Sequence, residues 1–94
     1  VIPKNHVKDI HEADAKTYSD VAATAKHVAD LLQRQLGSDG TTVFQMSREA
    51  GWQTVFHLHM HVIPRWYNDG LHKPWDIAPA QESDLLEVLQ QITK

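Results

Sequence analysis

Three histidines spaced two residues apart dominate the sequence. His57, His59 and His61 alternate with apolar residues along the segment His57–Val62. Because successive side chains of a β-strand point to opposite faces, this period predicts a half-buried strand with one apolar face and one row of imidazoles. Packing alone explains the row poorly, since three polar groups removed from water would each need hydrogen-bonding partners. We therefore interpret the row as a functional site.

The spacing of the row limits its chemistry. Neighbouring imidazoles on one strand face lie roughly 6.6–7 Å apart, and the outer two roughly 13 Å apart. A zinc or copper ion needs nitrogens at about 2.0–2.1 Å, so three rings could converge on one ion only with strained side chains. A phosphate chain suits the row better, because imidazoles donate hydrogen bonds to its oxygens while a neutral central ring attacks phosphorus. The row predicts phosphoryl or nucleotidyl transfer.

Two other functions stay open for these residues. A regulatory module would bind a nucleotide tightly and release no product. A metal-binding domain would use two of the histidines together with a ligand from another strand. A zinc titration of the His59→Asn variant would separate the metal-binding domain from the enzyme.

A long helix is predicted before the row. Between Ala13 and Leu36, apolar residues recur at steps of three and four. This period is typical of an amphipathic helix that lines a core or a dimer interface. Asp14 or Asp9 is placed to cap its start, and Gly37 is placed to end it in the left-handed conformation.

The other predicted elements complete an α+β fold with an antiparallel sheet, a long helix and a C-terminal helix. Thr41–Met46 has strand character, and Ser47–Trp52 would connect it to the histidine strand as a hairpin. Pro79 suits the first turn of a last helix. The apolar side of that helix would be formed by Leu85, Leu86, Val88, Leu89 and Ile92. Val1–Pro3 has the pattern of a buried strand end without an initiator methionine, so we expect a fragment that lacks its first strands.

Length and composition narrow the class of protein. The 94 residues predict one domain, 1–94, which is small enough to gain from a partner subunit. A net charge of −3 with nine scattered basic residues argues against nucleic-acid binding. The sequence has no cysteine, which suits a reducing cytosol, so we expect a cytoplasmic protein. Its apolar runs are too short for a membrane span, so no membrane partner is expected.

The segment Gln53–Arg65 resembles the signature of the histidine triad (HIT) superfamily, in which His-φ-His-φ-His-φ-φ follows Gly-Gln-Ser/Thr-Val, φ being an apolar residue. The strand end Pro3-Lys4-Asn5-His6 resembles the Pro-Lys-x-His of the same superfamily. The chain departs from the pattern twice. Met46 stands where family members often carry an amide, and Trp52 stands where they carry glycine.

The resemblance implies an α+β domain, commonly a homodimer, that binds a purine nucleotide or another nucleoside phosphate derivative and cleaves it at the α-phosphorus. It implies that His59 is the nucleophile and forms a covalent nucleotidyl intermediate. His57 and His61 would hydrogen-bond the phosphate oxygens and help to protonate the leaving group. His6 would hydrogen-bond a triad imidazole and so determine its tautomer.

The resemblance also implies the phosphate-binding residues and the cofactor requirement. Gln53 and Thr54 belong to the lead-in, and Thr54 offers a hydroxyl to a phosphate oxygen. Gln45 and Ser47 flank Met46, so they would take over part of the role of the amide. No cofactor is expected and no metal site is predicted in this chain. Any zinc would belong to N-terminal strands that precede Val1.

Overall fold

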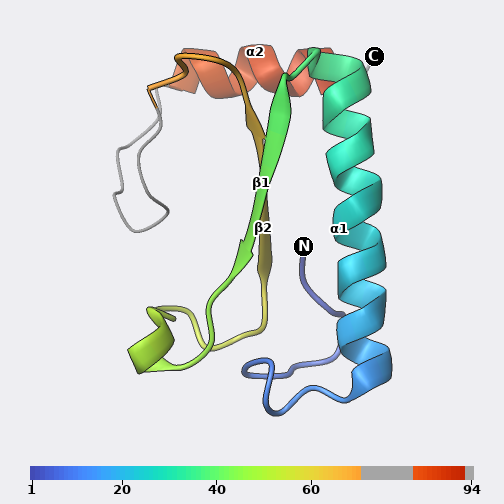
Figure 1. The fold of residues 1–94 in the computed structure, drawn as a ribbon, viewed down its shortest axis with the longest axis vertical. Coiled ribbons are helices and arrows are strands. Elements are labelled where there is room, and N and C mark those ends of the chain that lie inside the picture. Colours follow the sequence, from blue (N-terminus) through green and yellow to red (C-terminus); the bar gives the residue numbers. More distant parts are fainter. Residues whose placement is uncertain (71–81, 93–94) are drawn as a thin grey trace.

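A computed structural model describes residues 1–70 and 82–92. Its elements are α1 (Ala15–Leu36), β1 (Gly40–Gln45), a short 3-10 helix at Glu49–Gly51, β2 (Met60–Arg65) and α2 (Glu82–Ile92). This architecture confirms the predicted α+β fold with its long helix, antiparallel sheet and C-terminal helix (Figure 1). The predicted helix-starting Pro79 lies outside the described residues. None of the helices in the described ranges is long and apolar enough to cross a membrane.

Helix α1 starts and ends where local capping groups allow it. The carboxylate of Asp14 accepts a hydrogen bond from the backbone N–H of Thr17 at 2.7 Å, which satisfies one unpaired donor of the first turn. Gly37 ends the helix with φ 67° and donates its N–H to the carbonyl of Gln33 at 2.9 Å. Asp9 caps a separate turn, where it accepts from the N–H groups of the two residues before Ala13. Asp14, and not Asp9, is therefore the cap of α1.

The two strands form an antiparallel hairpin whose register places Phe44 opposite His61 and Gln45 opposite Met60. Facing residues of a ladder share a face of the sheet, so Phe44 and His61 lie on one face and Gln45 and Met60 on the other. Met60 belongs to the buried core, which also contains Val21 and Ala25 of α1 and Leu58. Helix α1 therefore covers the Met60 face of the hairpin (Figure 1).

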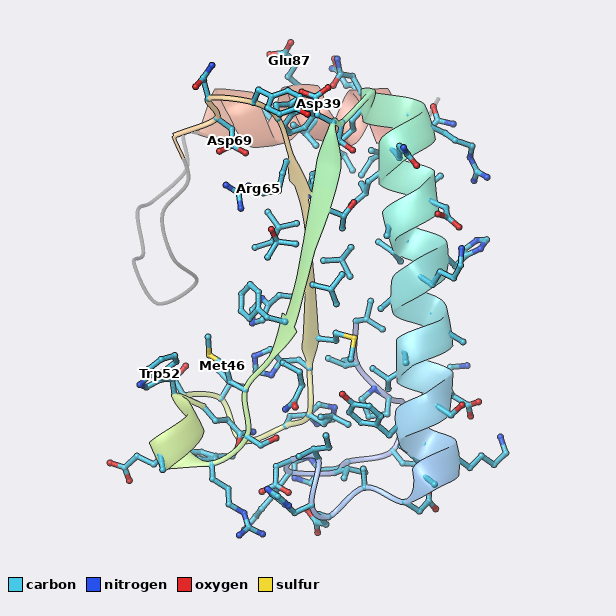
Figure 2. All side chains as sticks on the ribbon, in the orientation of Figure 1. Asp39, Met46, Trp52, Arg65, Asp69 and Glu87 are labelled. Atoms are coloured by element: carbon cyan, nitrogen blue, oxygen red, sulfur yellow. The ribbon has the colours of Figure 1, made fainter. Side chains whose placement is uncertain are left out.

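The opposite face of the hairpin lies away from α1. Figure 2 shows Met46, Trp52 and Arg65 projecting on that side. Arg65 is held there by Asp69, at 2.8 and 3.1 Å, and by the hydroxyl of Thr42 at 3.0 Å. Arg65 therefore stabilises the turn that follows β2.

The predicted histidine strand is shorter than expected. Strand β2 begins at Met60, so of the three histidines only His61 lies in it, and the segment before Met60 does not pair with β1. The reason is that the N-terminal segment takes a backbone hydrogen bond from this stretch. The N–H of Leu58 donates to the carbonyl of Val7 at 2.6 Å, and that of Met60 to the carbonyl of Val1 at 2.8 Å. The alternation survives, because Leu58 and Met60 are 0% and 7% exposed.

Candidate active site

The imidazole of His59 is oriented by the backbone of its own segment. Leu58 and Met60 are buried on either side of it, which anchors the backbone and leaves His59 half-buried. Its Nδ1 lies 2.7 Å from the carbonyl oxygen of His57. A carbonyl oxygen can only accept, so Nδ1 carries the proton and Nε2 keeps its lone pair when the ring is neutral. An imidazole in this tautomer can act as a nucleophile through Nε2.

His61 lies beside His59 on the hairpin face away from α1. The two ring centroids are 4.8 Å apart in an edge-on arrangement. The other side of the His61 ring stacks on Phe44, with centroids 4.4 Å apart and planes inclined by 18°. Partial removal from water lowers the pKa of His61 below its ordinary value, and the neighbouring His59 lowers the pKa further. Both effects favour the neutral form of the His61 ring over its charged form.

His57 pairs with His6 from the N-terminal segment. Their Nδ1 atoms are 3.0 Å apart, and their ring centroids 5.0 Å. Two Nδ1 atoms at this distance share one proton, because one ring must donate and the other accept. The Nε2 of His57 also lies 3.4 Å from the carbonyl oxygen of Pro3. The structure thus groups the four predicted catalytic residues in two contacting pairs, His6 with His57 and His59 with His61.

Gln53, predicted to bind phosphate, is buried and only 3% exposed. Its Oε1 accepts from the N–H of Arg48 at 2.6 Å, and its Nε2 donates to the carbonyls of Lys8 at 2.6 Å and Val55 at 3.1 Å. Both amide hydrogens are used within the protein. A phosphate could take the amide only by breaking these bonds, so in this structure the amide supports the loop, and phosphate binding by Gln53 stays a prediction.

Of the other three predicted phosphate-binding residues, Gln45 and Ser47 contact each other. Gln45 shares the α1-facing side with Met60, and its Nε2 donates to the hydroxyl of Ser47 at 2.6 Å. The Ser47 hydroxyl also accepts from the N–H of Ile10 at 3.1 Å. Thr54 is the exposed member of the predicted set. Phosphate binding by Thr54 stays a prediction, and its exposed side chain is accessible to a ligand.

An ion pair that the sequence analysis missed supports the same loop. Arg48 Nε lies 3.2 Å from a carboxylate oxygen of Asp9, whose side chain is largely buried. A hydrogen bond from the N–H of Glu12, together with the Arg48 side chain, holds the pKa of Asp9 below its usual range. Arg48 also has a left-handed backbone, with φ 65°. A positive φ at a non-glycine residue is uncommon, and nothing in the residue type of Arg48 predicts it, so the sequence did not reveal this loop conformation.

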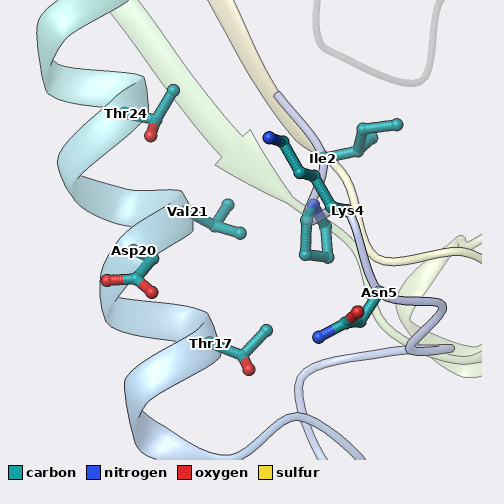
Figure 3. Close-up of a pocket in the computed structure, with 8 residues that line it drawn as sticks. Ile2, Lys4, Asn5, Thr17, Asp20, Val21 and Thr24 are labelled. Atoms are coloured by element: carbon teal, nitrogen blue, oxygen red, sulfur yellow. The ribbon is translucent and has the colours of Figure 1, made fainter.

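Two further features lie outside the histidine site. In the described part of the chain, no group of three His, Cys, Asp or Glu side chains is placed to hold a metal ion. A hollow of about 440 Å³ lies between the N-terminal segment and α1 (Figure 3), on the α1 side of the hairpin. It is lined by Ile2, Pro3, Lys4, Asn5, Thr17, Asp20, Val21 and Thr24.

With this geometry in hand, comparison with known proteins identifies the family. A family model described as the HIT domain matches residues 1–68, which is most of the chain and includes all four paired histidines. The chain belongs to the HIT family. This result confirms the resemblance drawn from Gln53–Arg65 and from Pro3–His6.

Curated HIT relatives span several kingdoms. The chain is 30% identical over 94 residues to an uncharacterized HIT-like protein of Mycoplasma genitalium and covers 66% of it. It is 27% identical over 94 residues to the adenosine 5'-monophosphoramidase of Schizosaccharomyces pombe, with 99% of this chain and 68% of that protein covered. Across the relatives that come first in the comparison, the chain spans between about half and two thirds of their length.

Solved HIT structures share the fold. A histidine triad nucleotide-binding protein of Sulfolobus tokodaii superposes with a TM-score of 0.78 at 32% identity, covering 97% of this chain and 62% of that one. A zinc-bound histidine triad family protein of Mycobacterium smegmatis superposes with a TM-score of 0.76 at 29% identity, covering 98% and 66%. The described architecture is therefore part of the HIT fold.

Proposed function

We propose that this HIT-family chain is part of a nucleotide hydrolase or transferase that cleaves a nucleoside phosphate derivative at its α-phosphorus, with His59 as the nucleophile. The observation that carries the proposal is the 2.7 Å contact between His59 Nδ1 and the carbonyl oxygen of His57. It directs the proton to Nδ1 and leaves the lone pair on Nε2. The name of the S. pombe relative, a monophosphoramidase, supports this substrate class.

The reaction has two balanced steps. The lone pair of His59 Nε2 forms a bond to the α-phosphorus, and the bond from phosphorus to the leaving group breaks. The leaving group keeps that electron pair and takes a proton from a flanking imidazole, His57 or His61. Water then attacks phosphorus, the P–N bond breaks with its electrons returning to Nε2, and the water proton returns to the flanking imidazole.

The carbonyl oxygen of His57 also supports the intermediate. Once Nε2 is bonded to phosphorus, the ring of His59 carries a positive charge with a proton on Nδ1. A carbonyl dipole already directed at that proton stabilises the developing charge without reorganisation. His57 and His61 donate to the phosphate oxygens, and Thr54 contributes its hydroxyl. For His57 this means that Nε2 exchanges its 3.4 Å contact with the Pro3 carbonyl for a phosphate oxygen. The proposal requires no metal.

Mass spectrometry of the full-length protein tests the mechanism. After rapid quenching with an adenosine phosphoramidate or a dinucleoside polyphosphate, we expect an acid-labile nucleotidyl adduct on His59 and none on the His59→Asn variant. Chelators should leave turnover unchanged. Turnover without an adduct on His59, or turnover that a chelator abolishes and a divalent ion restores, would overturn the proposal.

We also propose that the protein is a cytoplasmic homodimer that binds single purine nucleotides. Leu86, Val88 and Leu89 of α2 are 55%, 40% and 53% exposed, which is apolar surface that a second subunit could cover. Sedimentation of the full-length protein should give twice the mass of one chain, and a monomer at micromolar concentration would contradict this part of the proposal.

A further inference from the structure

The buried amide of Gln53 joins its own loop, at Arg48 and Val55, to the N-terminal segment, at Lys8, which is distant in sequence. Its Oε1 accepts from Arg48 at the start of the loop between β1 and β2. One hydrogen of Nε2 goes to the carbonyl of Lys8 at 2.6 Å, and the other to the carbonyl of Val55 at 3.1 Å. Each of these bonds is made with a backbone group, so together they restrain the relative positions of the loop and the N-terminal segment.

The two carbonyls that Nε2 contacts lie next to the paired histidines. Lys8 comes two residues after His6, and Val55 comes two residues before His57. The amide of Gln53 therefore bridges the two backbones that carry the His6 and His57 rings, beside the direct hydrogen bond from the N–H of Leu58 to the carbonyl of Val7. The imidazoles themselves meet at 3.0 Å between their Nδ1 atoms.

The His6 ring needs such support because it lies in an exposed part of the N-terminal segment. An exposed side chain samples several rotamers, and a 3.0 Å contact between Nδ1 atoms persists only if both backbones are held at the right separation. Two further contacts flank Gln53: the N–H of Leu58 donates to the carbonyl of Val7 at 2.6 Å, and Arg48 pairs with Asp9 at 3.2 Å. These contacts join the N-terminal segment to the same loop as Gln53 does.

We infer that Gln53 is a positioning residue that maintains the proton-sharing contact between His6 and His57. Its effect on turnover rests on the proposed function, in which His57 supplies hydrogen bonds and protons. Its effect on the geometry of the two rings does not. The hydrogen bonds of the Gln53 side chain go to the backbone, so its role in this inference is exerted through the two histidines.

Gln53→Glu is the sharpest test because it preserves the shape of the side chain. The carboxylate keeps an acceptor for the N–H of Arg48 but turns both Nε2 donor bonds into contacts between oxygens. Gln53→Asn is the second variant, because it keeps the amide and withdraws it by one carbon. Ala23→Gly is the matched control. Ala23 is exposed on α1, so glycine there lowers the stability of the helix without changing either histidine segment.

Nuclear magnetic resonance on the full-length protein without substrate reads the geometry. In the wild type we expect a nuclear Overhauser contact between the His6 and His57 rings, and ¹⁵N shifts that show one protonated and one unprotonated Nδ1. In both Gln53 variants the contact should weaken at least severalfold and the two Nδ1 shifts should converge. In Ala23→Gly both signals should stay at their wild-type values, although the melting temperature falls. Wild-type ring signals in either Gln53 variant, or equal changes in Ala23→Gly, would overturn the inference.

Kinetics separates this inference from the proposed function. If the positioning role and the proposed mechanism both hold, Gln53→Glu lowers kcat by a larger factor than it raises KM. In a protein that already carries His6→Ala, adding Gln53→Glu should cause no further loss of kcat. If the ring signals change as expected but the wild type forms no adduct on His59, the positioning role stands and the proposed mechanism fails. If the wild type forms the adduct on His59 but the Gln53 variants keep wild-type ring signals, the proposed mechanism stands and the positioning role fails.

Discussion

The Nδ1 atom of His59 lies 2.7 Å from the backbone carbonyl oxygen of His57. The backbone thus selects the tautomer of the central imidazole from only two residues away. A side-chain acceptor could rotate or titrate. The backbone carbonyl of His57 does not titrate, and its orientation is restrained by the buried Leu58 that follows it and by the contact of the His57 ring with His6. The orientation of the proposed nucleophile is therefore built into the local chain.

We predict that neutral His59 has its proton on Nδ1. Long-range ¹H–¹⁵N correlation spectra above pH 8 should show an Nδ1 shift typical of a protonated nitrogen and an Nε2 shift typical of a free lone pair. The exposed His27 of α1 provides a reference in the same spectrum. A His59 ring protonated on Nε2 would contradict the assigned hydrogen bond and the nucleophile with it.

We predict that His61 titrates below its ordinary pKa of 6.5 and that two substitutions raise its pKa. Phe44→Ala uncovers the stacked face of the ring, which restores hydration of the charged form. His59→Asn removes a neighbour that becomes positively charged, which also favours protonation. Titration of the His61 ring protons in each variant measures the shift. A pKa that stays constant in both variants would show that neither contact exists in solution.

We predict that Asp9 makes a pH-dependent contribution to stability. Its pKa is lowered in the folded protein from an ordinary value of 3.8. The ionised form therefore stabilises the fold above about pH 4, and this contribution is lost as the pH falls through the folded-state pKa. Chemical unfolding of Asp9→Asn and wild type should differ most near neutral pH and converge at lower pH. A difference that is constant with pH would indicate that charge plays no part.

We predict that Gly37→Ala destabilises the fold by about 1 kcal/mol, because a Cβ at a left-handed residue meets its own backbone. Gly37 has φ 67°, and a Cβ there would meet nothing else within 4 Å. Gly40→Ala is the matched control, since that position is equally open and has no positive φ. Urea unfolding of the two variants separates conformational strain from crowding. Equal losses in both would rule out the strain explanation.

The sequence predicted the elements that depend on near neighbours. Asp14 and Gly37 cap α1 as their residue types indicate, because a cap needs only the turn beside it. The hairpin follows from strand character in Thr41–Met46 and from the alternation around His59. The structure shortens the second strand to Met60–Arg65, because Leu58 pairs with Val7 and not with β1.

The candidate site divides in the same way. The histidine spacing identified His57, His59 and His61, and the family resemblance added His6. Neither showed that the four rings form two pairs. Gln53 has the residue type of a phosphate ligand, yet its amide is occupied by Lys8 and Val55, and the Asp9–Arg48 pair had no signal in the sequence.

By itself, the sequence determined the family, the α+β architecture, the buried alternation at Leu58 and Met60, and the caps of α1. Only the tertiary structure decided which groups meet, including the rings of His6 and His57, the rings of Phe44 and His61, and the amide of Gln53 with the carbonyl of Lys8. The physical reason is range. Periodicity and capping act over about four residues, so the local sequence is enough to predict them. A hydrogen bond between distant segments depends on where the whole chain brings its donor and acceptor, within the narrow distances that such bonds allow.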